Sequence, residues 1–194
     1  MTGTKWELFK VAMDLFAAGG YANVSIRDIA AAVGLNPASI YNHFPSKDAF
    51  LTEAYNFYER NYYEQLPTLE SLIELVPERS PQEIWRMMTP VYEDELLDLM
   101  TKIILVAIDE RRRDPNASTL IHEVFTKVPS RYITALLEEM IRLDMIESID
   151  IAHFVSLYSA FNLFASTRIG SIYPLSKEEW QGGLEFLLSL LRFK

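Results

Sequence analysis

The stretch at residues 24–50, VSIRDIAAAVGLNPASIYNHFPSKDAF, predicts two short helices joined by a tight turn and followed by a third helix. Ala30 falls where the first two helices must approach closely, and Gly34 falls where the turn favours a positive φ. Ile40 returns an apolar side chain to the core from the second helix. Helix-turn-helix proteins place this second helix in a DNA groove, and the alternative is a helical hairpin buried in an ordinary bundle.

Polar residues mark the start of each of these helices. Ser25 and Asp28 have the spacing of a capping box, with Asp in place of the usual Glu or Gln. Asn36 can cap the second helix, whose first turn accommodates Pro37, and Ser46 can cap the helix that follows. Loop chemistry and apolar spacing therefore favour the same helix-turn-helix.

The second helix leaves a face of small and polar residues for a partner. Helical periodicity turns Ile40 and Phe44 inward and leaves an outward set, Ala38, Ser39, Tyr41, Asn42 and His43. Ser39 and Asn42 can hydrogen-bond to base edges, and Ala38 can contact a thymine methyl group. Tyr41, His43 and Lys47 can contact phosphates. Each polar residue taken singly also fits a solvated helix face, so the prediction rests on their clustering.

The N-terminal part resembles the TetR family of bacterial ligand-responsive repressors through four features: a helix near 4–18, the Gly19-Gly20-Tyr21 break, SIRDIAAAVGL and IYNHFPSKDAF. The resemblance implies an all-helical homodimer with small N-terminal DNA-binding domains and a larger C-terminal domain that binds an effector and dimerises. It also implies which positions face DNA: Arg27, Ser39, Tyr41, Asn42, His43 and Lys47. Asn42 stands where the family often has a second aromatic residue, and Asn36-Pro37 replaces a commoner small or basic pair. These departures leave the operator sequence open.

Helix-period patterns dominate the rest of the chain, so we predict an all-α protein. We divide it into a helix-turn-helix DNA-binding domain at residues 1–48 and a helical effector-binding and dimerisation domain at residues 49–194. Thr4-x-x-Glu7 predicts a capping box at the start of the first helix. Further helix starts and breaks are expected at Ser46, Pro67, Ser80-Pro81-Gln82-Glu83, Thr89-Pro90, 110–118 and Ser176-Lys177-Glu178-Glu179.

The formal net charge of −9 is unfavourable for a DNA-binding protein as a whole. Residues 1–50 contain four basic and four acidic residues, so the acidity belongs to the rest of the chain. A neutral DNA-binding domain predicts weak non-specific affinity and a reliance on shape and on two linked binding events.

The last two helices, expected at about 150–169 and 177–193, carry more apolar side chains than one core can hide. In the final helix a set of leucines recurs at helical spacing, Leu184, Leu187, Leu188 and Leu191. These helices therefore predict a homodimer interface, with packing inside a monomer as the alternative. A two-fold dimer would place two recognition helices about 34–36 Å apart and prefer a palindromic operator in double-stranded DNA.

Apolar residues of the C-terminal part can line a cavity for a small, largely apolar effector. The expected lining is Trp85, Met88, Tyr92, Met100, Ile104, Phe125, Phe154, Tyr158, Phe161 and Asn162. Each of these residues alone also fits an ordinary core. An effector would release DNA if it bound more tightly to a dimer whose reading domains are misaligned.

Other classes of protein have little support in the sequence. No cysteine is present, and no HExxH, Gly-rich phosphate loop or GxSxG motif occurs, so we expect no enzyme, no metal site and no cofactor. No stretch is apolar enough to suggest membrane insertion, and Lys5, Glu7 and Asp14 interrupt the N-terminal segment, so a cytoplasmic location is expected. The predicted function is a dimeric, effector-released transcriptional repressor. The alternative is a helical module that binds a protein partner without DNA.

Overall fold

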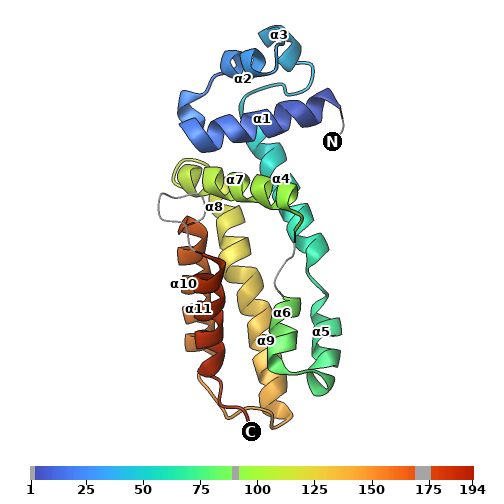
Figure 1. The fold of residues 1–194 in the computed structure, drawn as a ribbon, viewed down its shortest axis with the longest axis vertical. Helices are drawn as coiled ribbons and strands as arrows, with labels where there is room; N and C mark the ends of the chain where they lie inside the picture. The colour runs from blue at the N-terminus through green and yellow to red at the C-terminus, as the bar shows by residue number, and fades with distance from the viewer. Residues whose placement is uncertain (1–2, 89–91, 169–175) are drawn as a thin grey trace. The chain divides into compact units, whose positions relative to one another are not determined.

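The computed structural model describes residues 3–88, 92–168 and 176–194, and these ranges are helical with no β-strand (Figure 1). The predicted all-α class is therefore confirmed. The chain divides into two compact units, the first comprising residues 1–61 and 92–121 and the second comprising residues 62–91 and 122–194. None of the described helices combines the length and hydropathy needed to cross a membrane.

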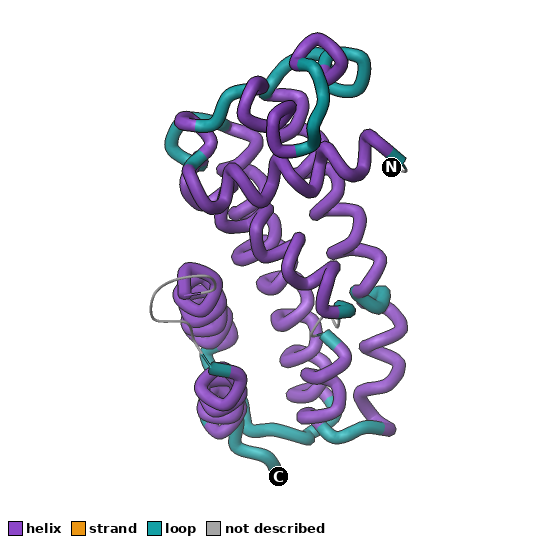
Figure 2. Tube along the Cα trace, turned by 45° about the horizontal axis from the view of Figure 1, so that its top comes forward, coloured by secondary structure: helices purple, strands orange, loops and turns teal. Residues whose placement is uncertain are grey.

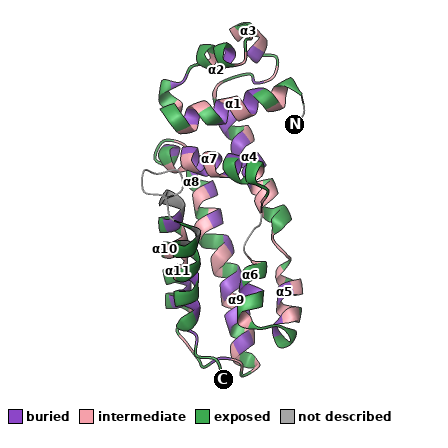
Figure 3. Ribbon diagram, viewed as in Figure 1, coloured by how far each residue is buried: buried purple, intermediate pink, exposed green. Residues whose placement is uncertain are grey.

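The first unit contains the helix-turn-helix and two longer helices that support it. Its elements are α1 (Thr4–Gly19), η1 (Tyr21–Asn23), α2 (Ile26–Ala32), α3 (Pro37–Ile40), most of α4 (Asp48–Gln65), α7 (Asp94–Glu110) and most of α8 (Pro115–His122). Helix α1 packs on α2 and on α7, and α2 packs on α3. The buried face of α1 consists of Leu8, Phe9, Ala12, Met13 and Phe16 (Figure 3). This helix is thus the central brace of the unit.

The second unit is a bundle built around α9. Its elements are the end of α4, α5 (Leu69–Leu75), η2 (Val76–Glu78), α6 (Pro81–Met87), η3 (Glu123–Lys127), α9 (Val128–Arg142), α10 (Ile151–Arg168) and α11 (Lys177–Ser189). Helix α9 packs against α5 and α10, and α10 packs against α11. Figure 2 shows the described residues as helices joined by loops. The single π-helical turn η3 precedes Pro129, whose ring and missing N–H disrupt regular helical bonding.

Several predicted boundaries are confirmed. Ser80 with Glu83 and Ser176 with Glu179 form capping boxes at the starts of α6 and α11. A break separates α7 from α8, where the Asp114 carboxylate accepts a 2.9 Å hydrogen bond from the Asn116 N–H. The proposed start at 89–90 lies outside the described residues.

Two local predictions were wrong. Thr4 does not cap the first helix, because Gly3 occupies the N-cap position and no side chain caps this end. The last helix ends at Ser189 rather than near Phe193, because the chain turns so that Phe193 pairs with Ile146 in an isolated antiparallel bridge. The Glu147 N–H donates to the Arg192 carbonyl at 2.9 Å in this bridge.

The compact units do not divide the chain at residue 48. The first unit continues to Asn61 along α4 and takes in residues 92–121, because α7 packs on α1. The division into residues 1–48 and 49–194 concerns the roles of the two parts rather than their packing, and it stays a prediction.

Candidate functional site

The first helix of the predicted motif begins at a complete capping box. The Ser25 N–H donates to Asp28 Oδ2 at 2.7 Å, and the Asp28 N–H donates to Ser25 Oγ at 3.2 Å. The Ser25 hydroxyl also donates to Asp28 Oδ2 at 2.6 Å. These hydrogen bonds favour the ionised carboxyl group and lower the pKa of Asp28, with the side-chain bond as the largest cause. Asp therefore serves here in place of the usual Glu.

The turn between α2 and α3 is closed by a Schellman motif. Gly34 adopts φ +68°, the left-handed conformation that the sequence predicted for it. The Leu35 N–H donates to the Ala30 carbonyl at 2.9 Å, and the Gly34 N–H donates to the Ala31 carbonyl at 3.2 Å. This turn sets the direction in which α3 leaves α2.

Helix α3 is short but its helical course continues past its formal end. The Ala38 N–H donates to Asn36 Oδ1 at 2.9 Å, which is the predicted cap, and Pro37 lies in the first turn. Beyond Ile40, the Phe44 N–H donates to the Ile40 carbonyl at 2.9 Å, as in an α-helix. Residues 41–43 form a hydrogen-bonded turn that continues directly from α3, so Ala38 to His43 follow a helix-like course.

The structure separates the inward and outward residues of this stretch as the periodicity predicted. Ile40 and Phe44 are fully buried. The exposed members of the predicted DNA-facing set are Arg27, Ala38, Tyr41 and Asn42, and the half-buried members are Ser39, His43 and Lys47. The Tyr41 side chain is the most prominent, at 54% exposure. Polar, aromatic and cationic groups thus gather beside an apolar anchor.

Two stacked phenylalanines anchor this surface to α4. The Phe44 and Phe50 rings lie 3.8 Å apart between centroids with an interplanar angle of 17°. The ring of Phe16 in α1 lies edge-to-face with the Phe50 ring, with 6.2 Å between their centroids. Side chains from α1, the end of α3 and α4 thereby form one core.

Lys47 is held by the protein more firmly than the sequence suggested. Its ammonium donates to the Tyr21 carbonyl and lies 4.0 Å from the centroid of the Tyr21 ring. Burial lowers the pKa of Lys47, while the neighbouring Asp48 opposes that shift. The Tyr21 hydroxyl in turn hydrogen-bonds to Asp48. Lys47 therefore ties the residues just before α4 to η1, in addition to any contact with a ligand.

The remaining cations of the first 50 residues differ in their partners. Lys5 pairs with Glu53 at 3.1 Å, and Lys10 pairs with Glu95 at 2.9 Å. Arg27 makes no ion pair with any residue that the structure describes. Its positive charge is consequently available at the exposed surface of α2.

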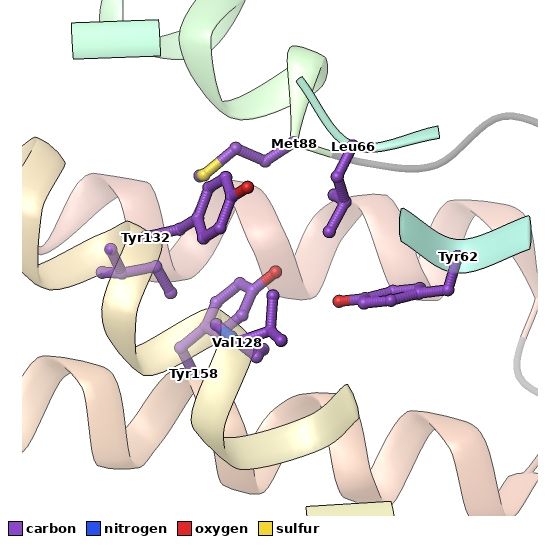
Figure 4. A pocket seen from close by; sticks show the side chains of 8 residues that line it. Tyr62, Leu66, Met88, Val128, Tyr132 and Tyr158 are labelled. Carbon is purple, nitrogen blue, oxygen red and sulfur yellow. The ribbon is translucent and has the colours of Figure 1, made fainter. Parts of the chain in front are cut away.

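A small cavity lies in the second unit (Figure 4). Its volume is about 30 Å³, room for a few water molecules. The lining comes from the end of α4 and the helices that follow, with Tyr62, Leu66, Met88, Val128, Pro129, Tyr132, Ile133 and Tyr158. The Tyr132 hydroxyl donates to the Pro67 carbonyl at 3.0 Å, and burial raises the pKa of Tyr158. Among the described residues that line this cavity, none has a charged side chain.

The structure brings only two of the ten predicted effector residues to this cavity, Met88 and Tyr158. Trp85 is buried beside it and meets Tyr158 edge-on at 5.3 Å between ring centroids. Three of the ten belong to the first unit, namely Tyr92, Met100 and Ile104. The others lie in the second unit outside the lining: Phe125, Phe154, Phe161 and Asn162. Of these, Phe154 belongs to the core of that unit and Phe161 packs against it.

Two of these residues have contacts that explain their positions. A methyl group on Gly183 would lie 2.3 Å from the Phe161 ring, so Phe161 marks the close approach of α11. The Asn162 amide donates to the Tyr158 carbonyl at 3.2 Å within its own helix. The cavity residues that sequence reasoning missed include Tyr62, whose only signal was the aromatic-rich end of α4.

No grouping of His, Asp or Glu in the described ranges could hold a metal ion. The outward face of 27–47 and the cavity of the second unit are the candidates for the predicted DNA-binding and effector-binding roles.

Sequence comparison matches residues 8–54 to the family described as "Bacterial regulatory proteins, tetR family". The transcriptional repressor KstR2 of Rhodococcus jostii is 40% identical over 52 residues, which make up 27% of this chain and 26% of that protein. The aligned part therefore spans about a quarter of this relative's length.

Similar solved structures extend the likeness to the whole fold. The ketosteroid transcriptional regulator KstR2 of Mycobacterium tuberculosis has a TM-score of 0.66 at 17% identity, with 100% of this chain and 97% of that chain covered. The TetR-family regulator PfmR of Thermus thermophilus has a TM-score of 0.62 at 17% identity, with 94% and 97% covered. At this identity the likeness concerns the fold.

The capping box predicts a pH-dependent contribution of Asp28 to stability. Its pKa is lower in the folded chain than the value of about 3.9 expected when unfolded, so its contribution is complete above that pH and is lost as the pH falls through the folded pKa. We expect the urea midpoint of the wild type to exceed that of Asp28→Asn at pH 7, and the gap to shrink below about pH 4. A gap that stays constant over the acid range would contradict the assignment.

Proposed function

We propose that this chain is a dimeric transcriptional repressor of the tetR family, released from a palindromic operator by a small effector. The proposal is supported by the match of residues 8–54 to that family of bacterial regulatory proteins. The observation that carries the DNA-binding part is the exposed, helically ordered face of 38–43 next to a buried aromatic anchor. A cytoplasmic location follows from this proposal, since the operator is chromosomal DNA.

The proposed contacts follow from the chemistry of the exposed face. Ser39 and Asn42 read base edges, and Ala38 contacts a thymine methyl group. Arg27, Tyr41 and His43 hold phosphates. Lys47 adds its positive charge to a phosphate while it stays hydrogen-bonded to Tyr21. Because few free cations contribute, we expect shallow salt dependence compared with strongly basic DNA-binding proteins.

Dimerisation is proposed through α10 and α11, which keep large apolar side chains exposed. Phe186 of α11 is 65% exposed and Leu157 of α10 is 52% exposed. The leucines that first suggested an interface are instead buried within the chain. Leu187, Leu188 and Leu191 belong to the core of the second unit, and Leu184 is 8% exposed. Exposed apolar residues of this size on two packed helices are typical of an interface.

The effector is proposed to bind at the cavity of the second unit. Its uncharged lining and its tyrosines favour an uncharged, largely apolar compound that carries a hydrogen-bonding group. Pockets for such compounds usually measure about 300–1,000 Å³, so binding requires a wider cavity than the 30 Å³ seen here. An effector that selects the wider state would shift the dimer away from the DNA-binding geometry.

The DNA-binding proposal predicts a near-palindromic sequence enriched from a random duplex pool. On that sequence, Tyr41→Ala should weaken binding at least about fivefold in fluorescence anisotropy, since one lost contact costs about 1–3 kcal/mol in a protein–DNA interface. Tyr63→Ala is the matched control, because Tyr63 is similarly exposed at 46% but lies in the second unit.

Equal affinity of Tyr41→Ala and the wild type would contradict the assigned surface. If no sequence is enriched, the alternative of a helical module for a protein partner gains support. Lys47→Ala should also weaken binding, but it removes the contact with Tyr21 and is therefore a less selective probe.

The dimer proposal predicts that Phe186→Asp converts a sedimenting dimer into a monomer, because a carboxylate would be buried without a partner at the interface. Leu97→Asp should leave the dimer intact, since Leu97 is similarly exposed, at 49%, but belongs to α7 and not to a proposed interface helix. A wild type that sediments as a monomer, or a Phe186→Asp variant that remains dimeric, would refute this interface.

The effector proposal predicts that phenol, indole or 2-naphthol lowers the anisotropy of the protein–DNA complex. Leu66→Trp should abolish that response without changing DNA affinity, because the larger ring fills the cavity from a half-buried position. If none of the three compounds acts, or if Leu66→Trp responds like the wild type, the cavity is not the effector site for this class.

A further inference from the structure

A second hollow lies in the first unit, bordered by α1, α4 and the start of α7. Its volume is about 330 Å³, and its lining is Trp6, Phe57, Glu93, Glu95, Leu96 and Leu99. None of these residues belongs to the proposed DNA-binding face or to the cavity of the second unit. The proposed function therefore leaves this site unexplained.

The walls of the hollow are aromatic and its rim is acidic. The Trp6 and Phe57 rings lie 5.4 Å apart between centroids with an interplanar angle of 37°. Leu99 contributes a buried apolar surface, whereas Glu93 and Glu95 are exposed. The lining residues that the structure describes include no cationic side chain. Aromatic faces and carboxylates both attract positive charge, while the aliphatic surface favours an apolar body.

The protein already places its own cation beside these groups. The Lys10 ammonium lies 5.6 Å from the centroid of the Trp6 ring and 2.9 Å from Glu95 Oε1. Its side chain is 37% exposed, so it can leave this position without opening a core. The Arg60 guanidinium similarly lies 5.7 Å from the Phe57 ring. The Trp6 ring and the Phe57 ring each therefore lie beside a cationic side chain of the protein itself.

The second rim carboxylate has no such partner. Glu93 makes no ion pair with any residue in the described part of the chain, and it lies immediately before α7. Its negative charge is therefore left for a ligand. Lys10 pairs with Glu95 and not with Glu93, so one of the two rim carboxylates keeps an unpaired negative charge.

We propose that this hollow binds an organic cation with an apolar or aromatic body. The positively charged nitrogen lies over Trp6 between the carboxylates of Glu93 and Glu95, and the apolar body packs against Phe57 and Leu99. Lys10 competes with the ligand for Trp6 and Glu95, so ligand binding displaces an ion pair that joins α1 to α7. This site is separate from the cavity proposed for the repressor's effector.

The probe for this proposal is benzyltrimethylammonium, titrated into the full chain by isothermal calorimetry. Benzyl alcohol is the uncharged aromatic control and should bind at least about tenfold more weakly, within the range expected for a cation–π contact together with a carboxylate. Glu93→Gln should weaken binding of the cation about three- to tenfold, whereas Glu7→Gln, an exposed carboxylate of α1 outside the lining, should leave it unchanged.

Lys10→Met should change the affinity for the cation in the opposite direction from Glu93→Gln. Removing the competing ammonium should tighten binding of benzyltrimethylammonium about three- to tenfold, a result that general destabilisation of the unit would not produce. The proposal is overturned if the cation does not bind, if benzyl alcohol binds equally well, or if Glu93→Gln has no effect. Weaker binding by Lys10→Met would overturn the competition between Lys10 and the ligand.

Discussion

The stacking of Phe44 on Phe50 is the contact on which the rest of the first unit depends. It fixes the end of the α3 turn on α4, and the edge of Phe50 meets Phe16 of α1. These side chains and that of Ile40 are fully buried in the core. The residues between Ile40 and Phe44 are therefore directed toward the surface, because the packed core has no room for them. The exposed face proposed to read DNA is thus a consequence of how its neighbours are packed.

Local features of this unit were predictable because they depend on residues close together in the sequence. Two or three neighbouring positions are enough to indicate each of three features: the capping box of Ser25 and Asp28, the left-handed Gly34 and the cap at Asn36. The cap expected at Thr4 failed because a threonine three residues before a glutamate does not by itself determine where the helix begins. The contact between Lys47 and Tyr21 could not be predicted from local sequence, because the two residues are far apart in the chain.

The cavity of the second unit could not be read from composition, because it depends on how four helices meet. Aromatic residues and methionines fit both a core and a pocket, and most of those expected at the effector site serve as core. Pro129 and Ile133 of α9 line the cavity although nothing in their sequence context distinguishes them from ordinary helix residues. Non-local packing likewise decides that the regularly spaced leucines of α11 are buried and that Phe186 is exposed.

The most direct test of the account is amide hydrogen exchange of the full chain with and without the DNA duplex enriched by selection. We expect added DNA to slow exchange in residues 25–48 of the first unit, where the capping box, the turn and the outward face lie. Protection confined to the second unit, or no change in residues 25–48 despite bound DNA, would contradict the claim that this surface is the DNA reader.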